Sequence, residues 1–178
     1  MPPPNTSVIT ITVLKKDPAV VAALAELLID TVANGGNISF MHPVPPALAH
    51  AFWEDALSAA ERGERVVFGA YEGDLLVGTT TLLYMWMPNQ PHRAEIAKMM
   101  TRVQCRGKGV ARALLQVAER TAIESGRTLL TLDTAAEDGG APFYEKLGFQ
   151  RAGVIPDYAL KPFGGLTGTI FYYKQIGK

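Results

Sequence analysis

The stretch QCRGKGVARALLQVAERTA, from Gln104 to Ala122, joins a basic, glycine-rich turn to an amphipathic segment. An apolar strand pattern covering about residues 94–101 ends just before it, and Ser125-Gly126 follows as a stop signal. Apolar or small side chains recur with helical spacing, so we expect one buried face made by Val110, Leu114, Val117, Ala118 and Thr121. The stretch therefore predicts a strand, a tight turn and a helix in immediate succession.

This strand–turn–helix order predicts an anion site. The first amides of a helix lack partners inside the helix and lie at the positive end of its dipole. Glycines allow the backbone to approach a phosphate closely. We expect the amides to come from Arg106, Gly107, Lys108, Gly109, Val110 and Ala111. The alternative is a glycine-capped helix start whose charges are merely solvated.

Spacing excludes two familiar phosphate motifs. A P-loop requires Ser or Thr after its Gly-Lys pair, whereas Gly109 follows Lys108 here. A dinucleotide-binding turn requires a third glycine at the position of Arg112. The remaining pattern is Arg-x-x-Gly-x-Ala, at Arg106, Gly109 and Ala111.

Composition limits the class of protein. The chain has 178 residues, is 48% hydrophobic, and carries 17 basic and 17 acidic residues. We expect a short disordered tail over residues 1–7 and a single domain over 8–178. Zero formal charge argues against nucleic-acid binding, and no apolar window is long enough to span a membrane. One cysteine and three unclustered histidines indicate no disulfide and no metal site, so a cytoplasmic, metal-free protein is expected.

Hydrophobic patterning predicts the element order βααβββαβαββ, in a mixed, mostly antiparallel sheet with helices on both faces. The class is therefore α/β or α+β. Asp17-Pro18 predicts a helix start and Glu72-Gly73-Asp74 a hairpin turn. The expected strands are 8–13, the two apolar runs of 65–87, 94–101, 128–134, 149–154 and 168–176; the expected helices are 18–35, 47–62, 110–125 and 141–147.

Two runs, AEIAKMMTRVQCRGKGVARALL (94–115) and LLTLDTAAEDGGAPFYEKLGFQRAGVIPDY (129–158), resemble the GCN5-related N-acetyltransferases (GNAT). Among them the sequence is most similar to the tabtoxin resistance proteins. The likeness is clear from Arg93 to Lys178 and extends to the N-terminal half only in element order. In this family the Arg-x-x-Gly-x-Gly/Ala turn holds the pyrophosphate of coenzyme A. The resemblance thus implies a GNAT fold and acetyl-CoA as cosubstrate.

The resemblance also implies roles along the preceding strand. This strand typically splays from its neighbour, and its amides bind the pantetheine arm and the acetyl carbonyl. Met99, Met100 and Thr101 occupy those positions. A backbone amide directed at the thioester oxygen stabilises the charge that develops when an amine attacks.

Three residues are the predicted catalytic groups. Tyr144 matches the family's acid, which protonates the departing thiolate, and a phenol with a pKa near ~10 suits that task. Glu95 and Asp133 match acidic positions of the tabtoxin-resistance pattern and are nearly equal candidates for the base. Alternatively, Glu95 pairs with Arg93 or Lys98, Asp133 accepts backbone amides, and Tyr144 is a core aromatic. Many family members also carry an asparagine before the short helix, and this sequence has none there.

The acceptor site is expected where the family builds it, from the loop after the first helix and from strand-end loops. Phe40, Trp86 and Tyr158 are the predicted substrate contacts, although ordinary core packing is an equal alternative.

These features predict transfer of an acetyl group from acetyl-CoA to the primary amine of a small molecule, either amino-acid-like or an antibiotic or toxin. The expected protein is a monomer or homodimer. One alternative is an acetyltransferase of a macromolecule such as a ribosomal protein. The other is a coenzyme A-binding sensor without transfer activity.

Overall fold

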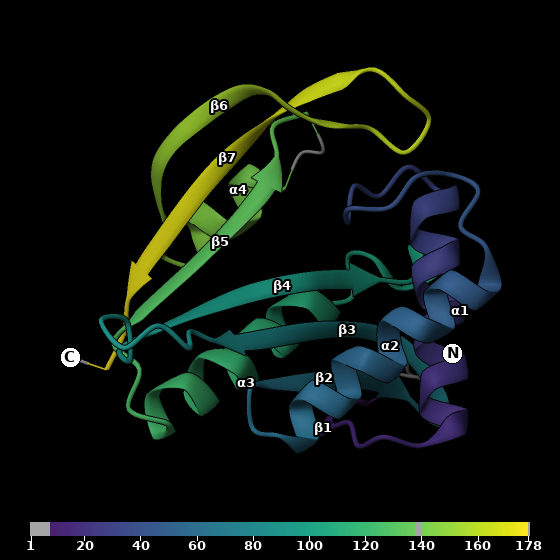
Figure 1. Ribbon diagram of the computed structural model, residues 1–178, viewed down its shortest axis with the longest axis horizontal. Coiled ribbons are helices and arrows are strands. Elements are labelled where there is room, and N and C mark those ends of the chain that lie inside the picture. Colours follow the sequence, from purple (N-terminus) through teal and green to yellow (C-terminus); the bar gives the residue numbers. More distant parts are fainter. Residues whose placement is uncertain (1–7, 138–139, 178) are drawn as a thin grey trace, which may run out of the picture.

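The computed structural model describes residues 8–137 and 140–177, so the predicted disordered tail, 1–7, lies outside the described residues. Its seven-stranded sheet has the order β1-β2-β3-β4-β5-β7-β6 (Figure 1). The predicted element order and mixed α/β class are confirmed, with one added 3₁₀ turn, η1. The elements are β1 (Ile9–Val13), α1 (Pro18–Ala33), α2 (Pro46–Glu61), β2 (Arg65–Glu72), β3 (Leu75–Tyr84), β4 (Arg93–Thr101), η1 (Val103–Cys105), α3 (Val110–Glu124), β5 (Leu129–Ala135), α4 (Ala141–Lys146), β6 (Gln150–Leu160) and β7 (Leu166–Gln175).

The centre of the sheet is split. Strands β4 and β5 are parallel, whereas the other five neighbouring pairs of described strands are antiparallel. Their pairing joins Arg93, Ala94 and Glu95 to Leu129, Leu130 and Thr131 and then stops. Beyond Glu95 the strands diverge into a V, with β1–β4 in one arm and β5–β7 in the other (Figure 1).

A bulge interrupts β4 within the diverging part. Thr81 pairs with Ala97 and Thr79 pairs with Met100, so two residues of β4 stand opposite one residue of β3. Lys98, inside the bulge, has a φ of 51°, which a non-glycine residue rarely adopts. The extra residue therefore reverses the alternation of side chains between the two faces of the sheet in the part of β4 that follows the bulge.

Helices cover both faces of the sheet, as predicted. Helices α1 and α2 pack on one face, where the buried Trp53 and Leu57 join a cluster with Val67 and Met100. Helix α3 packs on the other face, where Leu114 joins a separate cluster. The alternation of side chains along each strand explains this division, because neighbouring residues of a strand face opposite sides.

The first helix begins and ends where local chemistry dictates. The Asp17 carboxylate accepts a hydrogen bond from the Ala19 amide at 2.8 Å, and Pro18 occupies the first helical turn. At the other end, Gly36 must remain glycine, since a Cβ there would lie 2.5 Å from Thr31 Cγ2. The chain thus makes a tight turn after α1 before it enters the loop at residues 37–45.

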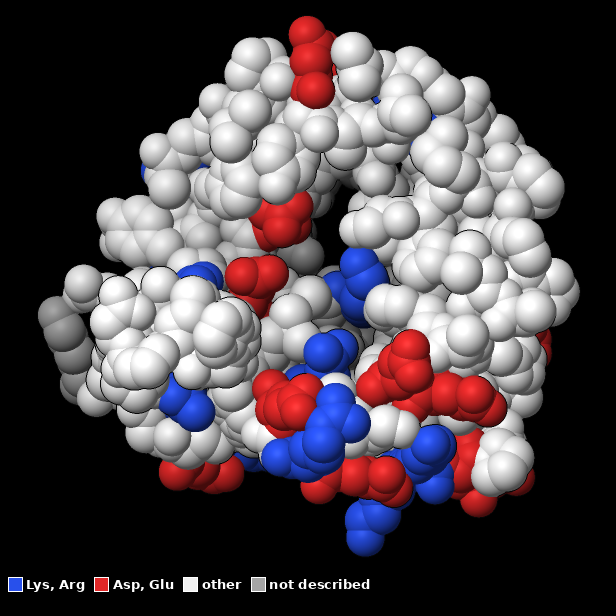
Figure 2. Space-filling model, in the orientation of Figure 1, with Lys and Arg blue, Asp and Glu red and all other residues white. Residues whose placement is uncertain are grey.

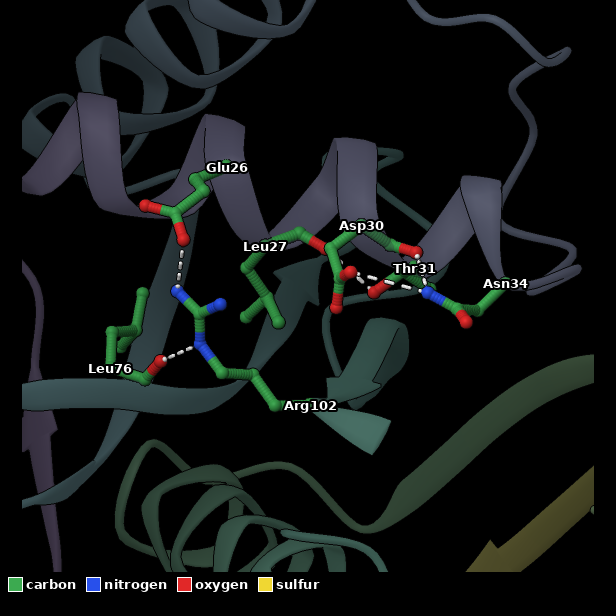
Figure 3. Close-up of polar contacts among 7 residues, drawn as sticks. All are labelled: Glu26, Leu27, Asp30, Thr31, Asn34, Leu76 and Arg102. Carbon is green, nitrogen blue, oxygen red and sulfur yellow. Dashed lines mark hydrogen bonds and ion pairs between the residues drawn. The ribbon is translucent and has the colours of Figure 1, made fainter. Parts of the chain in front are cut away.

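Arg102 fixes the end of β4 to two other elements (Figure 3). Its Nε donates to the Leu76 carbonyl on β3 at 2.8 Å, and its Nη2 donates to Glu26 Oε1 on α1 at 2.9 Å. The side chain is 13% exposed, whereas that of Glu26 is 68% exposed. The hydrogen bond to the Leu76 carbonyl is therefore better shielded from solvent than the ion pair with Glu26. Both bonds hold the chain in place just before η1 and the glycine turn.

We expect Arg102→Met to lower the free energy of unfolding by about 1.5–3 kcal/mol, because it leaves a part-buried carbonyl without its charged donor. Glu26→Gln should cost less than about 1 kcal/mol, as expected for an exposed ion pair. Urea denaturation of both variants measures the difference. Equal losses would show that the ion pair, rather than the carbonyl bond, holds the end of β4.

Candidate active site

The space between the two arms of the sheet is a cavity of about 360 Å³. We call it the splay cavity; it is lined by residues 37–41 after α1, 96–99 on β4, 133–135 on β5, Tyr144 on α4, 158–160 on β6 and Thr169 on β7. Figure 2 shows the molecule hollowed at this place, with acidic and basic side chains beside the opening. A cavity lined by both polar and apolar residues is thus present where the sheet loses its backbone pairing.

A contact between distant segments closes the open end of the V. The His42 amide donates to the Pro162 carbonyl at 2.9 Å. The rings of His42 and Phe163 lie 4.7 Å apart. The loop after α1 therefore contacts the β6–β7 turn, and together they limit the size of a molecule that can enter the splay cavity (Figure 1).

The glycine turn presents free amides, with one correction to the sequence prediction. The Arg106 amide donates to the Val103 carbonyl at 3.2 Å within the 3₁₀ turn, so it is not available to a ligand. Within 8–137 and 140–177, no hydrogen bond is formed by the amides of residues 107–112. The free amides therefore begin at Gly107, although Arg106 itself lines the adjoining hollow.

Backbone conformation explains the glycines of this turn. Gly107 has a φ of 76° and Gly109, the N-cap of α3, a φ of 83°. A Cβ at either position would meet no atom within 4 Å, so conformation rather than space requires glycine. The first turn of α3 carries no acidic residue. Unpaired amides, a helix N-terminus and open space fit a phosphate group.

The turn connects to the splay cavity through two further hollows of about 270 Å³ each. The turn pocket, which is lined by residues 105–107 and 109–112, shares Thr101, Arg106, Ala111 and Phe143 with the β4 channel. The β4 channel, which contains Met99, Met100 and Thr101, shares Asn37, Ile38, Met99, Thr134 and Tyr144 with the splay cavity. Because neighbouring hollows share lining residues, the three form one continuous groove. All the predicted cofactor residues except Lys108 line it.

Tyr144 stands where the β4 channel meets the splay cavity. The residue is 8% exposed, and its ring packs among those of Phe143, Phe149 and Tyr172. Burial, with a smaller contribution from the charge of Asp133, raises the pKa of Tyr144 to about 12. The phenol is therefore protonated at neutral pH and can donate a proton. Tyr144 belongs to the core and also borders the groove. The two sequence-based interpretations, a core aromatic and a proton donor, are therefore compatible.

Asp133 borders the same cavity from β5. The neighbouring residues Leu130 and Leu132 are buried in the cluster with α3, so alternation along the strand directs Asp133 to the opposite, open face. Partial burial raises the pKa of this carboxyl, and the positive charge of Lys98 opposes the rise. A carboxylate with a raised pKa is a better proton acceptor than an ordinary one.

Glu95 lies at the last paired position between β4 and β5, outside the lining of the splay cavity. It pairs with Thr131 at the end of the joined part of the sheet, and its Oε2 lies 3.6 Å from Arg93 Nη1. Burial and the charge of Asp133 raise its pKa, whereas Arg93 and Lys98 lower it. Glu95 is not among the residues that line the splay cavity. The structure thus distinguishes two carboxylates that the sequence ranked almost equally.

Lys98 is a cavity residue that the sequence reading missed. It was considered there only as a partner of Glu95, but it lines the splay cavity and its Nζ donates to Ser39 Oγ at 3.1 Å. Burial lowers the pKa of its ammonium group, and the carboxylates of Asp133 and Glu95 oppose that change. Its orientation depends on the β4 bulge, for which the sequence carries no local signal.

The predicted acceptor contacts divide between two places. Phe40 and Tyr158 line the splay cavity. Trp86 does not: it is 84% exposed and lines a separate hollow with Tyr84 and Arg127. The reason is the strand register, since Tyr84 pairs with Ala94 at the start of β4, whereas the bulge lies near the end of that strand. Of the three predicted acceptor contacts, Trp86 is therefore the one that the structure separates from the splay cavity.

Residues 8–137 and 140–177 contain no group of three or more His, Cys, Asp or Glu side chains arranged to hold a metal ion. No helix in this described part of the chain has the length and apolar character needed to cross a membrane.

Known proteins match both the sequence and the fold. The sequence model described as "Acetyltransferase (GNAT) family" matches residues 27–149. YsnE of Bacillus subtilis (strain 168), described as an uncharacterized N-acetyltransferase, is 32% identical over 136 residues, which cover 74% of this chain and 82% of YsnE.

Two solved structures show how far the fold is shared. An N-acetyltransferase from Staphylococcus aureus Mu50 superposes with a TM-score of 0.77 and 20% identity, covering 93% of this chain and 98% of that one. The protein yncA from Salmonella typhimurium, described as a putative acetyltransferase and solved with its cofactor acetyl-CoA, has a TM-score of 0.75 and 20% identity, covering 93% of each chain. At this level of identity the likeness establishes the fold.

We expect Gly109→Val to weaken coenzyme A binding by about tenfold or more, because the left-handed backbone costs about 1–2 kcal/mol for residues other than glycine. Lys108→Ala should change affinity by less than about threefold, since this exposed side chain lies 3.8 Å from Glu72. Titration calorimetry measures both dissociation constants.

Gly63→Val is the matched control, because Gly63 also has a positive φ (76°) and open surroundings but lies outside the groove. It should retain affinity for coenzyme A. A larger loss of affinity in Lys108→Ala than in Gly109→Val would mean that side-chain charge, not the backbone, makes the site.

Proposed function

Since the chain belongs to the acetyltransferase (GNAT) family, we propose that it transfers the acetyl group of acetyl-CoA to the primary amine of a small molecule. Family membership makes the protein an acetyl-CoA-dependent N-acetyltransferase. The proposal adds the acceptor class and direct attack of the amine on the thioester. The continuous groove from the free amides at 107–112 to the cavity beside Asp133 and Tyr144 carries this proposal.

The residues of the groove suit the parts of coenzyme A. The amides of residues 107–112 would bind the pyrophosphate, aided by the N-terminal end of the α3 dipole. Residues 99–101 would follow the pantetheine arm, because β4 has no paired strand on its β5 side beyond Glu95. Bound there, acetyl-CoA supplies the thioester that the acceptor amine attacks.

Asp133 is the proposed base. It lines the cavity, and its raised pKa favours acceptance of a proton from the ammonium form of the acceptor. Glu95 is occupied with Arg93, and the charge of Asp133 helps to raise its pKa, so we assign it no direct part in the proton transfer. This assignment replaces the near-equal ranking of the two carboxylates.

Tyr144 is the proposed acid. Its pKa of about 12 keeps the hydroxyl protonated until the thiolate forms. The burial that raises this pKa also raises the pKa of a thiolate formed beside it, so the proton can pass between them. Tyr144 borders both the channel and the cavity, as a donor to the leaving group must.

The limited size of the splay cavity favours a small acceptor. Its volume is about 360 Å³, and the contact of His42 with the β6–β7 turn restricts access. A ribosomal-protein terminus would need an open approach, and a non-catalytic sensor would need neither Asp133 nor Tyr144. Resemblance to tabtoxin resistance proteins supports an amino-acid-like acceptor or an antibiotic or toxin.

Tyr144→Phe should lower kcat by about 10²–10⁴, the usual contribution of a positioned acid. Coenzyme A affinity should be retained, because the hydroxyl is not needed to hold the pyrophosphate. Tyr173→Phe is the control, since the Tyr173 hydroxyl instead bonds Gln150 on the exposed side. Turnover in Tyr144→Phe equal to wild type at every pH would contradict the acid role.

Asp133→Asn should lower kcat by about 10²–10⁴, and Glu95→Gln by less than about tenfold. Asp133 must be ionised to accept a proton, so wild-type kcat should fall as the pH drops through its raised pKa. That acidic limb should disappear in Asp133→Asn and persist in Glu95→Gln. The reverse pattern in steady-state pH profiles would assign the base to Glu95.

A further inference from the structure

The splay cavity holds two opposite charges that do not bridge each other. Among its lining residues, Lys98 on β4 and Asp133 on β5 are the charged ones. In the described part of the chain neither side chain takes part in an ion pair within 4 Å. A cation on one arm and an anion on the other thus face a shared space.

The fold, rather than a carboxylate partner, holds Lys98 in place. Its Nζ donates to Ser39 Oγ at 3.1 Å and lies 5.8 Å from the centre of the Phe52 ring. Lys98 and Ser39 both have positive φ values, 51° and 75°, which are costly for these residue types. A cation held at such a position without an acidic partner retains its capacity to bind an anion.

We propose that Lys98, together with Ser39, binds a carboxylate of the acceptor, so that the acceptor is a small molecule carrying both a primary amine and a carboxylate. This inference rests on the proposed function and specifies its substrate. The ammonium group lies toward Asp133 and Tyr144, where the acetyl group is transferred. The carboxylate lies toward the β4 bulge and the loop after α1.

Charge complementarity explains how this cavity selects its acceptor. An amine without a carboxylate leaves Lys98 unpaired, and a diamine brings a second positive charge toward it. The cavity volume of about 360 Å³ also suits a molecule of amino-acid size. Loss of the contact between Lys98 and the carboxylate should therefore weaken binding of the acceptor and leave the reactivity of the thioester unchanged.

The test compares three forms of the same acceptor: α-amino acids, their carboxamides and the corresponding decarboxylated amines. Wild-type kcat/KM should be about 10- to 100-fold higher for the carboxylates, the range expected for a charged hydrogen bond. Lys98→Met should abolish this preference through a higher KM. Lys98→Arg should retain part of it, and Lys98→Glu should shift the preference to diamines.

Lys16→Met is the matched control, because Lys16 Nζ also donates to a serine, Ser58 Oγ at 2.8 Å, but on the exposed surface. It should keep the carboxylate preference. A second readout is calorimetric binding of the amino acid in the presence of coenzyme A. This binding should be lost in Lys98→Met while coenzyme A binding is unchanged.

Acetylation of small amines without preference for a carboxylate would overturn this inference and leave the proposed function intact. An equal loss of kcat for all three acceptor forms in Lys98→Met would also overturn it, because Lys98 would then serve the transfer step or the fold. Failure of the wild type to acetylate any small amine would overturn the proposed function and, with it, this inference.

Discussion

The loss of pairing between β4 and β5 after Glu95 is the constraint on which the site depends. Continuous pairing would bring the two strands within hydrogen-bond distance and leave no room for a ligand between them. Their divergence frees one edge of β4 and creates space between the arms of the sheet (Figure 1). It also directs Asp133 toward that space, where Tyr144 and Lys98 meet it from other elements.

Contacts on both sides of the split compensate for the lost strand pairing. Helices α1 and α2 share one buried cluster with β4, and α3 shares another with β4 and β5. Arg102 holds the end of β4 to β3 and α1 (Figure 3). The contact of His42 with Pro162 then joins the two arms across the opening. The cleft is therefore bordered by well-packed elements, which favours a fixed geometry for transfer.

Local chemistry made much of the fold predictable. The Asp17 cap, the glycine turn and the helical spacing after Val110 each depend on a few neighbouring residues, and each is found as expected. Three features depend on contacts that sequence patterns do not encode. The 3₁₀ turn uses the Arg106 amide, the strand register places Trp86 away from the cavity, and the β4 bulge directs Lys98 into it. The lining of the splay cavity was consequently harder to predict than the glycine turn.

The central claim is that one groove runs from the glycine turn to the acceptor cavity and places the reacting sulfur beside Tyr144. A crystal structure of the protein with coenzyme A tests it most directly. The account predicts a pyrophosphate bound by the amides of residues 107–112, a pantetheine arm along residues 99–101 and a sulfur atom next to the Tyr144 hydroxyl. Coenzyme A bound with its sulfur outside this groove, or with its pyrophosphate away from the turn, would contradict the account.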